Sequence, residues 1–399
     1  MKADGPSGPA RAAGSRRAAV VGLSLGRVCG VHDHARLLTS ELEREGWRCT
    51  THWLTREGAS LSRYRRDLRD WTGSLRKDLA REPPEAVILH YSVFSYGHAG
   101  FPVFVPRVFG ALAPVGAPIV GVLHEIAYPW HLDGLRGKAW AITQRLAAIE
   151  VMRRLDAAVV TTEERVAWLR TRPWLPRRPL SFAPVFSTLP PPGAGVAPDA
   201  GPPVVGMFGY SHPRSLVRLL LDGVQCLRAR GTRFQLRLFG RPGSASAAAD
   251  LWRGEASARG IGDMVSFSPW LPAPELADGL ARCAVLLFAD PGGATSRKTT
   301  LAALLASGRP AVVLDAPQTW RRMRDAEAVR LAEPTSASVA GALGALLADP
   351  AESAALAARG RAFYDTHMAV ESTARAFDEA LAAAQGRRPR LRQVVAAAA

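Results

Sequence analysis

One stretch of the sequence, ADPGGATSRKTTLAALLASGRPAVVLD at 289–315, carries the residues best suited to binding an anion. It follows an apolar run, passes through a glycine-rich turn at 291–293 and then presents hydroxyl and basic side chains where we expect a helix to open. Those side chains are Thr295, Ser296, Arg297, Lys298, Thr299 and Thr300. The first N–H groups of a helix are unpaired and its dipole is positive there, so this turn predicts a diphosphate site. The alternative is a capped helix with a solvated basic first turn, which the helix dipole disfavours.

Short apolar runs alternate with helical patterns along the chain and would position this turn. The predicted strands of the first half are 18–25, RCTTHWL, 86–92, 117–125 and 156–162; those of the second half are VVGMFG, FQLRLFG, MVSFSPW, 284–290, 310–315 and 328–333. Strands that are apolar on both faces and alternate with helices indicate a parallel sheet covered on both sides. Ligands of such sheets bind beyond the carboxyl ends of the strands. The predicted fold class is α/β, with two Rossmann-like domains facing a central cleft.

A change of composition divides the chain. The segment 187–203, STLPPPGAGVAPDAGPP, is rich in Pro, Gly and Ala and indicates a linker between domains at 18–186 and 204–385. Residues 1–17 and the basic stretch 386–399 are predicted to be disordered. The apolar run 101–123 contains Arg107 and four prolines, so we expect a buried helix and strand there instead of a membrane span. The N-terminal apolar run is too short for a span and lacks a signal-peptide cleavage context.

The composition narrows the class of protein. Hydrophobic residues make up 48% and charged residues 22% of the 399 residues, which is typical of a folded globular chain. The net charge of +16 favours anionic partners, although arginine in excess over lysine also fits a GC-rich genome. No nucleic-acid recognition motif is present, so no nucleic-acid partner is predicted. Four scattered cysteines indicate neither a zinc site nor a disulfide framework and favour a cytoplasmic location; they are Cys29, Cys49, Cys226 and Cys283.

The segment ASGRPAVV behind the glycine-rich turn resembles the nucleotide-sugar segment of GT-B glycosyltransferases of the large retaining class, glycosyltransferase family 4-like. Further segments resemble parts of that class: CGVHDHARLLTSELEREGW, VLHEI, VGMFGYSHPRSLVRLL and RLFGRPG. The stretch 296–300 is similar to an actinobacterial variant of the donor turn. The resemblance spans most of 18–385. It implies a bacterial, retaining, metal-independent glycosyltransferase without a cofactor, whose last helices pack back toward the N-terminal domain.

The resemblance assigns donor-binding roles in addition to those of 295–300. The residues concerned are Gly30, Gly209, His212, Arg214, Gly240 and Gly293. Arg214 is the candidate phosphate cation, because the usual Arg and Lys pair after the first donor-domain strand is altered here. Two glutamates that the class carries across the donor turn are replaced by Thr295 and Ala303. In the class the first reaches the sugar and the second holds the donor ribose, so both contacts must differ in this chain.

Polar residues at predicted strand ends of the first half complete the expected site. His124 and Glu125 are the predicted catalytic pair: His124 would bond the donor sugar, and Glu125 would orient an acceptor hydroxyl or stabilise an oxocarbenium-like charge. The alternative for His124 is a buried imidazole that donates to a backbone carbonyl. Predicted acceptor-binding residues are His32, Asp33, Tyr96 and His98. The alternatives are helix capping by Asp33 and a loop that packs on its own core. A metal site from His32 and His34 is not predicted, since the two do not face one way on a helix.

A basic helix is predicted at 62–81. Its apolar residues at helical spacing are Tyr64, Leu68, Trp71, Leu75 and Leu79. Such a helix could lie on an anionic membrane, although an amphipathic helix packed on its own sheet is favoured.

The predicted function is transfer of a sugar from a nucleoside-diphosphate sugar to a polysaccharide, glycolipid or natural product. The predicted location is the cytoplasm, or the periphery of the membrane at its inner face. The alternative is a non-catalytic glycosyltransferase-like partner protein, which the missing glutamates motivate.

Overall fold

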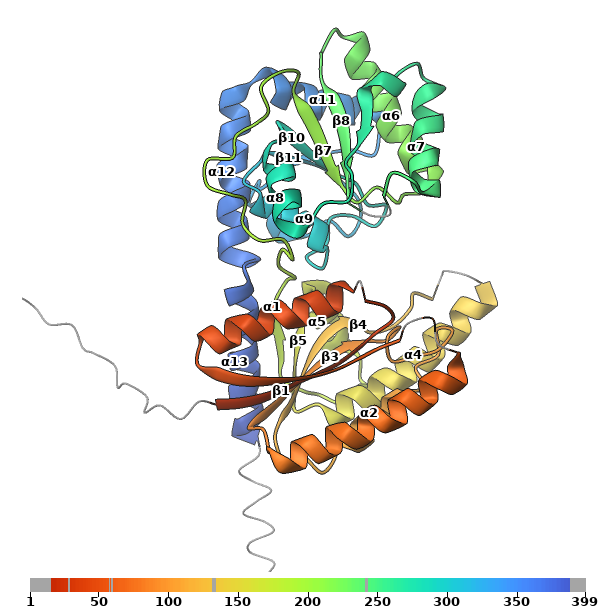
Figure 1. Cartoon of the computed structure of the whole chain (residues 1–399), viewed down its shortest axis with the longest axis vertical. Helices are drawn as coiled ribbons and strands as arrows, with labels where there is room; N and C mark the ends of the chain where they lie inside the picture. Colours follow the sequence, from red (N-terminus) through yellow and green to blue (C-terminus); the bar gives the residue numbers. More distant parts are fainter. Residues whose placement is uncertain are drawn as a thin grey trace, which may run out of the picture. The chain divides into compact units, whose positions relative to one another are not determined.

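The computed structural model describes residues 16–27, 29–56, 58, 60–130, 134–240 and 243–387, and the chain forms two compact units (Figure 1). Among the described residues, the first unit consists of those up to Ala158, of Pro173–Pro179 and of those from Asp378 on. The second unit consists of Val159–Arg172 and Leu180–Phe377. The chain therefore passes between the units more than once, whereas the sequence analysis placed a single boundary in 187–203.

The first sheet is six-stranded, with the order β2-β1-β3-β4-β5-β6. Its strands are β1 (Arg16–Ser24), β2 (Trp47–Thr55), β3 (Ala86–Ser92), β4 (Ile119–Glu125), β5 (Ala157–Val160) and β6 (Leu180–Phe182). The helices along this part of the chain are α1 (Gly30–Arg44), α2 (Leu61–Arg81), α3 (Val105–Leu112), α4 (Gly134–Arg154) and α5 (Glu163–Thr171). Strand β1 pairs in parallel with β2 and β3, and β3 pairs in parallel with β4. Figure 1 shows α1 on one face of this sheet and α2 and α4 on the other.

The second sheet is also six-stranded and parallel, with the order β12-β11-β10-β7-β8-β9. Its strands are β7 (Val204–Phe208), β8 (Gln235–Phe239), β9 (Val265–Phe267), β10 (Val285–Phe288), β11 (Ala311–Leu314) and β12 (Arg330–Ala332). Its helical elements are α6 (Arg214–Ala229), α7 (Ala247–Ser257), η1 (Gly262–Met264), α8 (Ala273–Ala281), α9 (Thr299–Ala306), α10 (Arg321–Asp325), α11 (Ser336–Ala348) and α12 (Pro350–His367); α13 (Val370–Arg387) follows.

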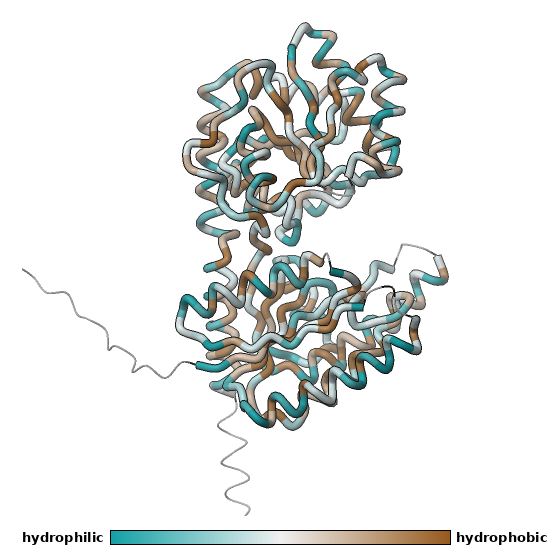
Figure 2. Tube along the Cα trace, in the orientation of Figure 1, coloured by the Kyte–Doolittle hydropathy of each residue, from teal (hydrophilic) through white to brown (hydrophobic). Residues whose placement is uncertain are grey.

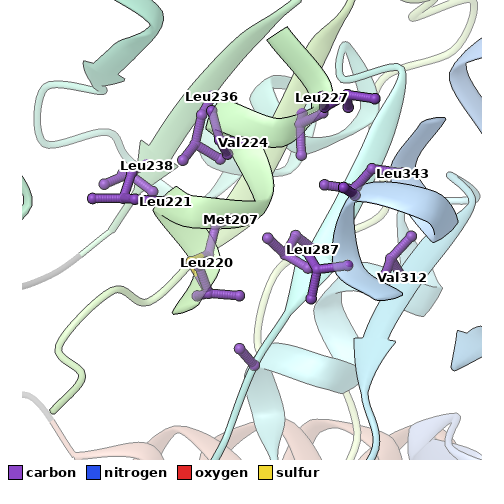
Figure 3. Packing of buried hydrophobic residues seen from close by; sticks show 14 of the residues in the cluster. Met207, Leu220, Leu221, Val224, Leu227, Leu236, Leu238, Leu287, Val312 and Leu343 are labelled. Carbon is purple, nitrogen blue, oxygen red and sulfur yellow. The ribbon is translucent and has the colours of Figure 1, made fainter. Parts of the chain in front are cut away.

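Alternate residues of the second sheet fill two separate cores. In β7, Val205 and Met207 belong to the core under α6, α7 and α11, whereas Val204 belongs to the core under α8, α9 and α12. Figure 3 shows part of the first of these cores, with Leu220 and Leu343 packed toward the sheet. Successive side chains of a strand point to opposite faces, so a strand buried on both faces has no polar alternation. Figure 2 shows the same pattern as hydrophobic strands at the centre of each unit.

Most predicted strands and helices are present, and the differences lie at their ends and between them. Strand β1 begins at Arg16, so Arg16 and Arg17 are not part of a disordered segment, while residues 1–15 lie outside the described residues. Helix α13 extends past 385, and 388–399 are not described. The short strand β6 was not predicted. The segment 101–123 does form a buried helix and a buried strand, α3 and β4.

The segment 187–203 has no helix or strand, as expected, but it is not a free linker. The Gly193 N–H donates to the Asp278 carboxylate at 2.7 Å, and the Asp199 N–H donates to the Arg282 carbonyl at 3.2 Å. Leu189 packs against the core under α8 and α9. The proline-rich composition therefore marks an irregular segment that is bound to the second unit.

Helix α2 uses its apolar stripe inside the first unit. Tyr64, Leu68 and Leu75 are each 1% exposed, and the Tyr64 ring meets the Phe104 ring edge-on at 4.8 Å. This stripe is therefore not available to a membrane surface. Among the described residues no single helix is long and apolar enough to cross a bilayer; Ser336–Ala348 and Pro350–Gly386 reach that length only as a pair bent by 105°.

Candidate functional site

The strand order of the second sheet defines a topological switch point. Strands β7 and β10 are neighbours, and the chain continues from them toward opposite edges of the sheet. Beyond the carboxyl ends of two such strands, the loops separate and leave room for a ligand. The loop after β7 carries Gly209, His212 and Arg214, and the loop after β10 carries 289–298. The fold thus brings together two segments that the sequence analysis had assigned to one donor site.

Glycine is required where the β7 loop approaches its neighbours. Gly209 has φ +81°, and a Cβ there would lie 3.6 Å from the Thr300 methyl group in the first turn of α9. Gly240, with φ +86°, would place a Cβ 2.7 Å from the Phe208 ring. Both residues adopt a left-handed backbone that other residues rarely tolerate. Because Gly209 has no side chain, a ligand could approach its backbone closely beside the start of α9.

The loop after β10 is held in one conformation by its own contacts. Gly293 has φ +107°, and a Cβ would lie 2.6 Å from the Thr319 backbone nitrogen. The Asp290 carboxylate accepts the Gly292 N–H at 2.9 Å and pairs with the Lys298 ammonium at 2.5 Å. The turn and its lysine are therefore pre-organised by a single carboxylate.

Helix α9 begins later than predicted. It opens at Thr299, with Lys298 as the N-cap residue, so the expectation that Thr295 opens the helix was wrong. Residues 295–298 form an irregular turn in which the Ser296 hydroxyl donates to the Thr161 carbonyl at 2.7 Å. That buried hydroxyl therefore already has a partner within the protein. Lys298 and the first-turn residues Thr299 and Thr300 stand at the helix N-terminus, while Arg297 precedes them and is half-buried.

Three side-chain polar atoms on these loops are buried without a hydrogen-bond partner among the described residues, and the Tyr210 hydroxyl is one of them. The His212 Nε2 and the Thr295 Oγ1 have no hydrogen-bond partner among the described residues. Burial lowers the pKa of His212, and the nearby Asp290 carboxylate offsets this only in part, so the imidazole is neutral at pH 7. A buried polar group without a partner costs about 1–3 kcal/mol. Such atoms on the loops beyond the carboxyl ends of two strands are places where a bound ligand could complete the hydrogen bonding.

Arg214 is the first residue of α6, and its side chain is already engaged. It lies 3.5 Å from the Glu255 carboxylate, which Arg218 and Arg259 also approach at 3.0 and 2.9 Å. The Arg214 side chain remains 65% exposed and has the longest of the three contacts. The structure thus places the predicted phosphate cation in an arginine cluster around one carboxylate.

In the first unit the predicted residues divide between surface and core. His32 stacks on the Trp53 ring at 4.5 Å, and Gly30 opens α1, with Cys29 as the N-cap residue instead of Asp33. Tyr96 is fully buried, and its hydroxyl donates to the His90 carbonyl at 3.1 Å, so it lies in the core instead of at an acceptor surface. The half-buried His98 pairs with Phe101 in an isolated bridge, and Glu125 ends β4, also half-buried.

His124 belongs to a histidine cluster that sequence reasoning missed. His34 of α1, His90 of β3 and His124 of β4 each offer a ring nitrogen, and the three atoms lie within 4.8 Å of one another. The His90 Nδ1 lies 3.2 Å from the His124 Nε2. Burial lowers the pKa values of His34 and His90, so both imidazoles are neutral. The sequence does place each of the three histidines after or near the end of a strand. It does not give the order of the strands in the sheet, and that order is what brings the three together.

Known structures share this two-sheet architecture. Sucrose-phosphate synthase from Thermosynechococcus elongatus matches with a TM-score of 0.63 at 16% identity, over 96% of this chain and 100% of that chain. HepE from Anabaena, in complex with UDP and glucose, matches with a TM-score of 0.63 at 14% identity, over 92% and 99%. The fold is that of the GT-B glycosyltransferases. WaaG, a glycosyltransferase involved in lipopolysaccharide biosynthesis, has the same fold, with a TM-score of 0.60 at 13% identity over 90% and 98%.

The sequence itself lies far from these GT-B structures. No family model matches it, and no curated protein sequence matches it. At identities of 13–16% the GT-B likeness describes the path of the chain, and roles for individual side chains must come from the geometry of the two strand-end regions.

Proposed function

We propose that this chain transfers a glycosyl group from a nucleoside-diphosphate sugar to an acceptor hydroxyl, and that the second unit binds the donor at its switch point. The observation that carries the proposal is that two buried atoms on the two loops at that switch point, His212 Nε2 and Thr295 Oγ1, lack a partner within the described part of the chain. The Gly209 turn beside the start of α9 supplies the close backbone approach that a diphosphate requires. The GT-B structure solved with UDP and glucose supports the same ligand class.

The chemistry we propose uses positioning and fixed charge. The bond between the sugar C1 and the donor phosphate oxygen breaks, the nucleoside diphosphate leaves with the electron pair, and the acceptor oxygen bonds to C1 as its proton departs. Charge that develops on the diphosphate would be stabilised by the first N–H groups of α9 and by Lys298. The ion pair with Asp290 holds the Lys298 ammonium in place, and the carboxylate offsets part of its positive field. The resemblance to the retaining class is the basis for proposing that the anomeric configuration is retained.

For the acceptor we propose the strand ends of the first unit. Glu125 ends β4 beside the histidine cluster, and His32 and Asp33 stand in the first turn of α1. A carboxylate at that position can orient a hydroxyl and take up its proton. His124 is 9% exposed and lies against His90. We therefore propose that His124 holds the end of β4, and with it Glu125, in position.

A turnover assay tests the proposed activity. Purified protein is incubated with a panel of UDP-, GDP-, ADP- and dTDP-sugars, with water or extracted bacterial glycolipids as acceptor, and nucleoside diphosphate release is followed. We expect release from donors of one base, with a mass increment of one sugar on the acceptor. Tight nucleotide binding without any release would favour the non-catalytic partner protein instead.

We further propose that the acceptor is lipid-linked and that the protein reaches it at an anionic membrane; an exposed apolar face of α4 supports this proposal. Leu135, Ile142 and Leu146 share one side of the helix and are 84%, 50% and 61% exposed. Leu146 also lines a groove of about 340 Å³ with Phe101 and Val103. Lys138, an exposed cation of the same helix, matches anionic headgroups, and exposed apolar residues beside cations are typical of helices that lie in a membrane interface.

Sedimentation with liposomes tests this contact. The triple variant Leu135→Ser, Ile142→Ser, Leu146→Ser should lose at least about tenfold in affinity for vesicles that contain anionic lipid, because roughly 1.5–3 kcal/mol per inserted side chain is removed. The matched control changes three exposed arginines of α2: Arg65→Gln, Arg66→Gln and Arg69→Gln. If only the α2 variant lost binding, the membrane contact would lie on the basic face of α2 and the α4 proposal would be wrong.

A further inference from the structure

The histidine cluster of the first unit has no role in the donor site proposed for the second unit. His34 comes from the second turn of α1, His90 from the end of β3 and His124 from the end of β4. All three side chains are buried, with exposed fractions of 1%, 0% and 9%. Histidine is only intermediate among residues in its tendency to be buried, so three converging imidazoles in one core are unusual.

The spacing of the ring nitrogens fits a metal ion. In a tetrahedral site with metal–nitrogen bonds of about 2.0–2.1 Å, two ligand nitrogens lie about 3.3 Å apart. The His90 Nδ1 and the His124 Nε2 are 3.2 Å apart, and no pair in the cluster exceeds 4.8 Å. The widest pair would therefore need to close by about 1.5 Å, which small side-chain rotations supply. Each of the three ligands comes from a different element, one helix and two strands, and their side chains converge on one point.

The three rings are held in place by packing. His90 lies between the Trp53 ring, at 6.0 Å, and the His124 ring, which is stacked at 5.5 Å. The His34 ring meets the His124 ring edge-on at 4.9 Å. The Nε2 of His90 is buried and has no hydrogen-bond partner among the described residues. A metal bound through the His90 Nδ1 would leave the ring proton on this Nε2, and the packing already fixes the orientation of the rings.

We propose that His34, His90 and His124 bind one divalent late first-row transition metal ion, zinc foremost, with a fourth position left to water. Neutral imidazole is a preferred ligand of such ions, and affinity at nitrogen sites rises toward copper and zinc. The ion joins the start of α1 to the ends of β3 and β4. It thereby fixes the first turns of α1 and the position of Glu125, and it contributes to the stability of the first unit.

This proposal departs from the sequence-based expectation of no metal, and it is separate from the diphosphate chemistry. The cations proposed for the diphosphate are side chains of the second unit. Loss of the metal should leave nucleotide binding by the second unit unchanged. Failure of the metal proposal and failure of the donor-site proposal are thus distinguishable in two separate titrations.

Metal titration of the full, tag-free chain tests the site. The protein is stripped with a chelator and titrated with Zn²⁺ against a chromophoric competitor, and with Co²⁺, whose visible absorption reports tetrahedral coordination. We expect one ion per chain and a melting temperature that rises with Zn²⁺ and falls with chelator. The variant His90→Gln should lose at least about tenfold in affinity, because even outer-shell changes cost 10–100-fold. The control is His52→Gln, a half-buried histidine of β2 that lies 4.0 Å from Asp78 and outside the cluster.

Two results would overturn the proposal. One is a wild-type chain that retains no zinc and gives no tetrahedral Co²⁺ spectrum, which would leave a purely hydrogen-bonded histidine cluster. The other is a spectrum that persists unchanged in His90→Gln with His124→Gln, which would place the ion elsewhere. Because the wild-type titration and melting curves need no variant, the proposal stays testable even if a substituted chain fails to fold.

Discussion

At the scale of single residues, the donor site depends on whether polar side chains have partners, and the sequence reveals this only in part. The hydroxyl and basic residues of 295–300 could be recognised because they follow a strand and a glycine-rich turn. The sequence could not show that the Ser296 hydroxyl has a hydrogen-bond partner and that the Thr295 hydroxyl has none among the described residues. The partner of Ser296 is the carbonyl of Thr161, 135 residues away. The histidine cluster was missed for the same reason: its members are brought together by strand order.

His212 should couple nucleotide binding to protonation. Burial holds its pKa below the usual value, so the free protein keeps it neutral, and a bound diphosphate would favour the charged form and raise that pKa. Binding near pH 6.5 should therefore take up protons. Calorimetry in two buffers of different ionisation enthalpy measures the uptake. We expect His212→Gln to reduce it and His367→Gln, a histidine of the same unit outside the two loops, to leave it unchanged; equal uptake in all three proteins would exclude this role.

The same shift predicts how His212 affects stability. Because its folded-state pKa is lowered, the unfolded chain binds more protons as the pH falls below about 6.5. The contribution of the neutral imidazole is therefore complete above that pH and is lost progressively below it. Denaturant unfolding of wild type and His212→Gln between neutral and acid pH should show a smaller acid loss in the variant.

At the scale of elements, the alternation of strands and helices predicted both sheets, because strands apolar on both faces have a distinctive pattern. What could not be predicted is the short strand β6, whose three half-buried residues carry no periodicity, and the start of α9. The opening of α9 shifted because residues 295–298 bond to the protein around them instead of continuing the helix. Local propensity places a helix, but tertiary contacts decide its first turn.

Strand β1 offers an element-scale test, since Gly22 lies under an aromatic ring. A Cβ at Gly22 would lie 2.1 Å from the Trp53 ring, which in turn stacks on His32 and donates to Ser24 at 3.1 Å. Gly22→Ala should lower the free energy of unfolding by about 1–3 kcal/mol through overpacking. Gly26→Ala, where a Cβ meets nothing within 4 Å, is the matched control. Similar unfolding curves for both variants would mean that the β1–β2 packing is wrongly described.

At the scale of the whole molecule, the charge of +16 predicts attraction to any polyanion, so specific and non-specific binding must be separated. Raising the salt concentration from 50 to 200 mM should weaken contact with nucleic acid by about 10³–10⁵ if six or more phosphates are neutralised. A nucleoside diphosphate carries few charges, so its affinity should fall by roughly tenfold or less. Filter binding and calorimetry at both salt concentrations measure the two losses. Nucleic-acid affinity that resists salt would point to a nucleic-acid-binding function instead.

The most direct test of the account is calorimetric titration with UDP, GDP, ADP and dTDP of wild type, Gly209→Ala and Gly231→Ala. The two glycines have almost the same backbone, φ +81° and +83°, but a Cβ at Gly231 meets nothing within 4 Å, whereas at Gly209 it faces Thr300. The account predicts that wild type and Gly231→Ala bind one nucleotide equally and that Gly209→Ala binds it at least tenfold more weakly, about 1.4 kcal/mol. Binding of none of the four, or equal binding by both variants, would contradict a donor site at the switch point of the second sheet.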